Sequence, residues 1–124
     1  MSARILYIED NESNLYLVTF LLQARGHTVV QARDGAEGLA LALAERPDLI
    51  LLDIQLPDLD GYETARLLRA EPDGGGVPII ALTSYAMAGD REKALAAGCS
   101  GYIEKPINPD TFIATIERFL PAAP

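Results

Sequence analysis

The chain has 124 residues, of which 49% are apolar and 23% are charged, a composition typical of one globular domain and not of a disordered segment. The formal net charge is −8 and the ten Lys and Arg residues are scattered, which argues against direct nucleic-acid binding. No apolar run approaches the ~18 residues of a membrane span, and the lone Cys99 excludes an intramolecular disulfide. We therefore expect a cytoplasmic protein without membrane contact.

The first half of the chain alternates short apolar runs with longer helical patterns. The first helix ends before Gly26, a natural C-terminal cap. The second opens with Asp34 and Glu37 at capping-box spacing and is stopped by Pro47. The predicted elements of this half are a strand at 4–8, a helix at 14–25, a strand at 28–32, a helix at 34–46 and a strand at 49–53.

The second half continues the same alternation. Asp60 and Glu63 repeat the capping spacing at the start of a third helix, which ends at EPDGGG, residues 71–76. Asn108 is the expected N-cap of the last helix, and Pro109 suits its first position. The remaining predictions are a strand at 78–83, a helix at 86–97 and a strand at 101–105.

Five strands alternating with five helices predict an α/β fold. The runs are rich in Ile, Leu and Val and mostly lack two-residue alternation, as in parallel strands covered on both faces. We predict a doubly wound five-stranded parallel sheet of order 2-1-3-4-5, with right-handed crossovers and helices on both faces. One domain over residues 1–120 and a short tail at 121–124 are expected.

Polar side chains follow four of the five predicted strands. Glu9 and Asp10 follow the first, Asp53 ends the third, Thr83 ends the fourth and Lys105 ends the last. In a doubly wound sheet, ligands bind outside the carboxyl ends of the strands, where the strand order reverses. The order 2-1-3-4-5 brings all five side chains to that edge.

Three carboxylates in one crevice repel one another unless a cation lies between them. Carboxylates supplemented by water suit Mg²⁺, with Mn²⁺ as a second choice. Together with Lys105, such a metal forms a site for a phosphoryl group, which a carboxylate can accept as nucleophile. Taken singly, each residue also has an ordinary explanation: Asp53 as a turn residue, Asp10 and Thr83 as helix caps, and Lys105 as a solvated lysine.

The motifs ILYIEDNE, DLILLDIQLPDLDG, PIIALTSYAM and GYIEKPI occur in an order and spacing that resemble a known family. The sequence is similar to the receiver domains of two-component response regulators, the CheY-like family with a flavodoxin-like fold. The resemblance covers essentially the whole chain. It is strongest to DivK-like single-domain regulators and to the receivers of hybrid sensor kinases.

The resemblance implies roles for individual residues. Asp53 matches the phosphoacceptor. Glu9 and Asp10 match the acidic pair, with Asp10 a direct metal ligand and Glu9 acting through a metal-bound water. The backbone carbonyl of Gln55 matches the third protein ligand, beside Asp10 and Asp53. The implied cofactor is Mg²⁺.

The resemblance also implies a switch. Thr83 matches the hydroxyl that follows the phosphoryl group, and Tyr102 the aromatic switch position. Lys105 matches the lysine that pairs with the phosphate, and the bond from Lys105 to Pro106 is expected to be cis. Phosphorylation would then alter a surface made of the fourth helix, the fifth strand and the fifth helix.

The implied partners are a histidine kinase or histidine phosphotransferase and a downstream protein target, with the chain a monomer or weak dimer. We expect a signalling domain that assists its own phosphorylation and dephosphorylation rather than an enzyme. Tyr85 beside the site is expected to shield the phosphoryl group from water. A metal-dependent phosphohydrolase with an Asp nucleophile, a nucleotide-binding module and a pseudo-receiver interaction module remain alternatives.

The first predicted helix is apolar nearly all round, so its outward stripe raises a separate question. Leu15, Val18 and Leu22 form a core stripe. A second stripe, expected near the site, contains Asn14, Leu17 and Leu21, and we expect it either to dock the histidine partner or to be buried.

Overall fold

A computed structural model of the chain describes residues 2–71, 76–84 and 89–120. Its five strands form one parallel sheet in the order β2-β1-β3-β4-β5, as predicted. The strands are β1 (Arg4–Ile8), β2 (Thr28–Ala32), β3 (Leu49–Asp53), β4 (Ile79–Thr83) and β5 (Gly101–Glu104). Among the described residues the helices are α1 (Glu12–Ala24), α2 (Gly35–Glu45), α3 (Gly61–Ala70), α4 (Asp90–Ala96) and α5 (Pro109–Arg118).

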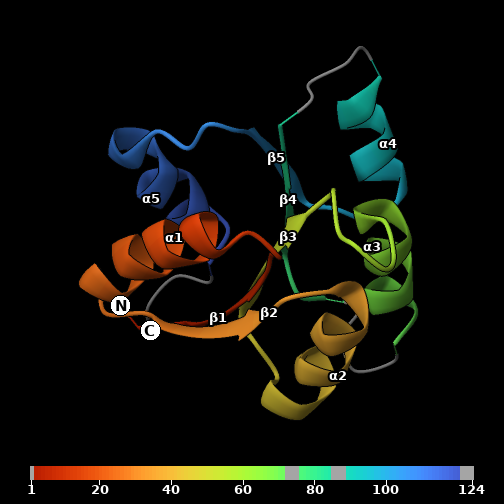
Figure 1. Ribbon diagram of the computed structural model, residues 1–124, viewed down its shortest axis with the longest axis horizontal. Helices are drawn as coiled ribbons and strands as arrows, with labels where there is room; N and C mark the ends of the chain where they lie inside the picture. Colours follow the sequence, from red (N-terminus) through yellow and green to blue (C-terminus); the bar gives the residue numbers. More distant parts are fainter. Residues whose placement is uncertain (1, 72–75, 85–88, 121–124) are drawn as a thin grey trace.

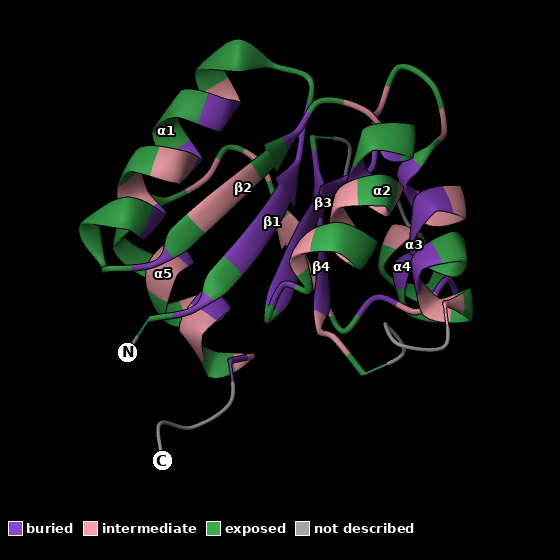
Figure 2. Ribbon diagram, turned by 90° about the horizontal axis from the view of Figure 1, so that it is seen from below, coloured by how far each residue is buried: buried purple, intermediate pink, exposed green. Residues whose placement is uncertain are grey.

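The helices cover both faces of the sheet. Figure 1 shows α1 and α5 on one side and α2, α3 and α4 on the other. Each face has its own hydrophobic core: Tyr7, Leu51 and Phe112 belong to the α1/α5 side, and Leu52 and Ala65 to the α2/α3/α4 side. Figure 2 shows β1, β3 and β4 buried along most of their length, which explains their continuous apolar sequence.

Local capping explains where most helices begin. The side chains of Asp34 and Asp60 accept hydrogen bonds from the backbone N–H of Glu37 and Glu63, as the capping spacing predicts. Asn108 caps α5 in the same way. The structure contains no helix, within the residues it describes, that is long and apolar enough to cross a membrane.

Two helix starts differ from the predictions by two or more residues, and the other helix boundaries given as predicted ranges differ by one. The first helix begins at Glu12 rather than residue 14, because the side chain of Asn11 accepts the backbone N–H of Asn14 and so fixes an earlier cap. The fourth begins at Asp90 after Gly89, whose φ of 91° is left-handed, and the expected start at residues 86–88 lies outside the described residues. The predicted tail at 121–124 also lies outside them.

The loop after β3 is held more tightly than its composition suggests. Asp58 is exposed, as expected of a loop residue, but its carboxylate accepts the backbone N–H groups of Gly35 and Ala36 at 2.7 and 3.0 Å. These are the first amides of α2, and donors at a helix N-terminus favour a negative charge. The hydrogen bond from Gly35 is the main reason that the pKa of Asp58 lies below its usual value. Asp58 therefore ties this loop to α2 and is not merely solvated.

Candidate functional site

Two buried carboxylates lie side by side at the carboxyl edge of the sheet. Asp53 is the last residue of β3, and Glu9 directly follows β1. Strands β1 and β3 are paired, with Ile8 opposite Leu52. Glu9 is 0% exposed and Asp53 is 3% exposed. Asp10 is exposed beside them, and one oxygen from each of the three acids lies within 4.8 Å of the others. The strand order therefore brings together the three acids that the sequence predicted.

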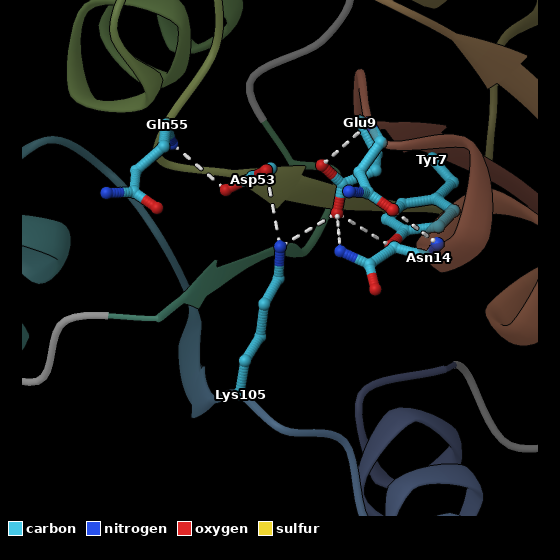
Figure 3. Close-up of polar contacts among 7 residues, drawn as sticks. Tyr7, Glu9, Asn14, Asp53, Gln55 and Lys105 are labelled. Atoms are coloured by element: carbon cyan, nitrogen blue, oxygen red, sulfur yellow. Dashed lines mark hydrogen bonds and ion pairs between the residues drawn. The ribbon is translucent and has the colours of Figure 1, made fainter.

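Lys105 enters this acidic cluster from the end of β5. Its Nζ donates to Glu9 Oε1 at 2.8 Å and to Asp53 Oδ2 at 3.3 Å, so one ammonium bridges both buried acids (Figure 3). The peptide bond between Lys105 and Pro106 is cis. Strand β5 ends at Glu104, one residue earlier than predicted, so Lys105 lies just beyond the strand.

The pKa values of the two buried acids, Glu9 and Asp53, are shifted in opposite directions. Burial, reinforced by the neighbouring Glu9 carboxyl, raises the pKa of Asp53 to about 7, although the backbone N–H of Gln55 at 3.0 Å and the Lys105 ammonium act in the opposite direction. Burial also penalises the charged form of Glu9, but hydrogen bonds with Asp53 and Lys105 outweigh it and hold the pKa of Glu9 below its usual value. The pair of carboxyls therefore retains one proton until near neutral pH.

The donor set fits a divalent cation. With all three acids ionised, Lys105 leaves two negative charges uncompensated within the cluster. Negative charges held this close together repel one another. A small hard cation that binds oxygen ligands compensates the charges and removes this repulsion. Glu9, Asp10 and Asp53 supply carboxylate oxygens for it, and the Gln55 backbone follows two residues after Asp53.

The two predicted switch residues lie on the two strands that follow β3 in the sheet: Thr83 on β4 and Tyr102 on β5. Thr83 ends β4, is 3% exposed, and its carbonyl accepts the Lys105 backbone N–H at 2.7 Å. Tyr102 lies inside β5 and is half-buried, with the guanidinium carbon of Arg91 in α4 at 5.8 Å from its ring centroid. Tyr102 is therefore in contact with α4 rather than with the acids. Tyr85 lies outside the described residues.

Two further side chains contact Glu9, and the sequence motifs did not predict these contacts. Tyr7 Oη donates to Glu9 Oε1 at 3.1 Å, and Asn14 Nδ2 donates to the same oxygen at 3.2 Å. Tyr7 is a buried core residue, but its hydroxyl also reaches the site. The available signal was its position: residues two apart on a strand share a face, so Tyr7 and Glu9 point the same way.

The sequence matches the response regulator receiver domain family over residues 5–117. This chain belongs to that family. The receiver domain is 42% identical over 120 residues to the polar-differentiation response regulator DivK of Brucella anthropi, covering 97% of this chain and 98% of that protein. Because the match spans nearly the whole of both chains, it supports a DivK-like signalling role for the receiver domain.

Solved structures show the same architecture. The receiver domain aligns with the chemotaxis response regulator CheY4 of Vibrio cholerae at a TM-score of 0.91 and 32% identity, covering 97% of this chain and 100% of that one. The receiver domain of the sensor histidine kinase PA1611 from Pseudomonas aeruginosa aligns at 0.88 and 39% identity, covering 96% and 98% of the two chains. That protein has a magnesium ion coordinated in its active-site cleft.

These likenesses decide between the alternatives that the sequence left open. The chain is a receiver domain of two-component signalling, and neither a phosphohydrolase nor a pseudo-receiver is favoured. The acidic character of the loop after β1 agrees, because a nucleotide-binding module would place a glycine-rich turn there.

Proposed function

We propose that Asp53 of the receiver domain accepts a phosphoryl group from a phosphohistidine of a partner protein. The observation that carries the proposal is the placement of Asp53: a carboxylate 3% exposed, at the end of a central strand, beside two other acids and within 3.3 Å of Lys105 Nζ. In the reaction the bond between phosphorus and the imidazole nitrogen breaks, and a bond between phosphorus and a carboxylate oxygen of Asp53 forms. The imidazole leaves with the electron pair and takes up a proton.

We further propose that Glu9, Asp10, Asp53 and the backbone carbonyl of Gln55 hold Mg²⁺, with Mn²⁺ able to replace it, and that Glu9 contributes through a bound water. When bound, the metal neutralises charge on the phosphoryl oxygens. The acidic cluster, with two charges beyond what Lys105 balances, supports this assignment. Asp53 is in place as nucleophile once it has lost its proton, and Lys105 Nζ is placed to pair with the incoming anion.

The proposed output is a change in the surface around α4, β5 and α5. An added phosphoryl group brings about −1.5 to −2 charge units, and we expect Lys105 and the Thr83 hydroxyl to respond to it. The loop after β4 and Tyr102 would follow, which alters the contact between Tyr102 and Arg91. The structure around Tyr102 supports this route because its ring already touches α4.

The proposed docking face for the histidine partner is the outward side of α1. Leu15, Val18 and Leu22 are buried in the core, whereas Leu17 is 40% exposed and Phe20 is 60% exposed. The alternative that both stripes of α1 are buried is therefore wrong for Leu17. Because α1 begins two residues after Asp10, a helix docked on this side lies next to the acids.

The decisive experiment incubates the protein with Mg²⁺ and a small acyl phosphate and follows its intact mass. We expect one phosphoryl adduct on the wild type and on Asp58→Asn, a control in the same loop, and none on Asp53→Asn. Peptide mapping should place the adduct on Asp53. An unmodified wild type, or an adduct that survives Asp53→Asn, would contradict the proposal, and phosphate released without an adduct would favour a hydrolase.

A further inference from the structure

One oxygen of Glu9 is surrounded by donors from three separate elements. Glu9 Oε1 accepts from Lys105 Nζ at 2.8 Å, from Tyr7 Oη at 3.1 Å and from Asn14 Nδ2 at 3.2 Å. Figure 3 shows the three contacts converging on this oxygen, with the other carboxylate oxygen on the side of Asp53. The Glu9 carboxylate is thus oriented: three side chains hold Oε1, whereas Oε2 accepts the long contact from the Asn11 backbone N–H at 3.4 Å and lies on the side of Asp53.

The three donors are not equivalent when the site is in use. Lys105 also contacts Asp53 at 3.3 Å, so in the proposed function it turns toward the phosphoryl group and its contact with Glu9 weakens. Tyr7 and Asn14 are neutral and belong to β1 and α1, and neither contacts Asp53 among the described hydrogen bonds. They can hold Glu9 whether or not Lys105 remains.

Tyr7 and Asn14 are both held in position by their surroundings. Tyr7 is 0% exposed, with its ring in the core on the α1/α5 face, so its hydroxyl has a fixed position two residues before Glu9 on the same side of β1. Asn14 lies in the first turn of α1, where the side chain of Asn11 accepts its backbone N–H at 2.9 Å. Removing either donor leaves Glu9 Oε1 with one neutral donor besides Lys105, so the carboxylate is less firmly oriented.

We propose that Tyr7 and Asn14 are positioning residues for the metal site: they fix the Glu9 carboxylate so that its second oxygen faces the cation independently of Lys105. The inference rests on the proposed function, because it concerns the same Mg²⁺. Groups that orient a metal ligand through hydrogen bonds change metal affinity by about 10- to 100-fold when removed. Two neutral donors share the task here, so we expect about tenfold for either one alone.

The test measures the Mg²⁺ dissociation constant by isothermal titration calorimetry on unphosphorylated protein, at a temperature where melting curves show every variant folded. Tyr7→Phe and Asn14→Leu should each bind Mg²⁺ about tenfold more weakly than the wild type. The matched control is Tyr16→Phe, since Tyr16 is 75% exposed on α1 and should bind as the wild type does.

A double-mutant cycle separates positioning from packing. In a Glu9→Asp background the carboxylate is one methylene shorter and withdraws from Tyr7, so Tyr7→Phe should then add little further loss of affinity. A tenfold loss in both backgrounds would mean that Tyr7 acts through packing and would overturn the inference. Equal Mg²⁺ binding by wild type, Tyr7→Phe and Asn14→Leu would overturn it while leaving the proposed function intact. A wild type that binds no Mg²⁺ would overturn both.

Discussion

Replacing Lys105 with Met tests the charge balance of the site most directly. The substitution keeps an unbranched side chain of similar length and removes the ammonium that bridges Glu9 and Asp53 at 2.8 and 3.3 Å. The side chains of all three residues are at most 11% exposed, so solvent screens these contacts little. Without Mg²⁺, the variant must bring two neighbouring carboxylates close together with no cation between them.

The expected loss of stability depends on pH. At an effective dielectric constant of 20, a contact at about 3 Å is worth roughly 5 kcal/mol, and removing one partner of a buried pair costs about 3 to 5 kcal/mol in practice. Tyr7, Asn14 and the Gln55 backbone still donate to the two acids, so we expect about 3 kcal/mol at pH 8. At pH 5 the pair carries one proton and we expect about 1 kcal/mol.

The pH trend has a definite sign. Burial raises the pKa of folded Asp53 to about 7 from 3.8, so between these values the folded state binds more protons than the unfolded state. Asp53 therefore lowers the stability of the wild type progressively as pH rises through this window. Removing the Lys105 ammonium raises that pKa further and extends the decline to higher pH.

Thermal unfolding in a chelator at pH 5 and pH 8, repeated with Mg²⁺, provides the assay. We expect Lys105→Met to lower Tm by about 10 °C at pH 8 and by about 3 °C at pH 5, with most of the deficit at pH 8 recovered by Mg²⁺. The matched control is Lys93→Met, the exposed lysine of α4, with little change. An equal loss at both pH values, unaffected by Mg²⁺, would show that Lys105 contributes packing and not charge balance.

Two further predictions concern the loop after β3 and the face of α1. A Cβ at Gly61 would lie 2.4 and 2.8 Å from backbone atoms, so Gly61→Ala should lower the free energy of unfolding in urea by about 1–3 kcal/mol. Gly76→Ala, where a Cβ meets nothing within 4 Å, is the control, and equal stabilities would refute the steric argument. Leu17→Asp should slow phosphotransfer from a histidine partner about tenfold or more, but should not slow phosphorylation by acyl phosphate. The control is Leu43→Asp, at an exposed position of α2, which should slow neither reaction. Unchanged transfer by Leu17→Asp would exclude this docking face.

The strands could be predicted because the signal for them is local, and their order could be predicted from the doubly wound alternation of strands and helices. Each buried strand is a short apolar run, and β1, β2 and β3 have the predicted bounds residue for residue. The convergence of the acids then follows from topology, since the carboxyl ends of parallel strands share one edge. The proximity of Asp53 and Glu9 could therefore be predicted without knowledge of side-chain conformations.

The features that the sequence did not predict depend on non-local geometry. No spacing rule connects Asp58 with the amides of Gly35 and Ala36, because the contact exists only once the β3 loop lies over the start of α2. Five consecutive polar residues follow Glu9, and which of them caps α1 depends on the extended backbone conformation of Asn11.

The burial of the strands suggests why a signal from Asp53 should spread in one direction. Strands β3 and β4 are buried at every residue, whereas β5 is half-buried with an exposed end. Local rearrangement is easiest where few apolar contacts must break. Glu9 and Asp53 lie at the ends of buried central strands, whereas Lys105 follows the half-buried edge strand β5, in which Tyr102 contacts Arg91. If Asp53 is phosphorylated as proposed, we expect the response to follow the half-buried β5 side rather than the buried β1 side, and so to be directed toward α4 and α5.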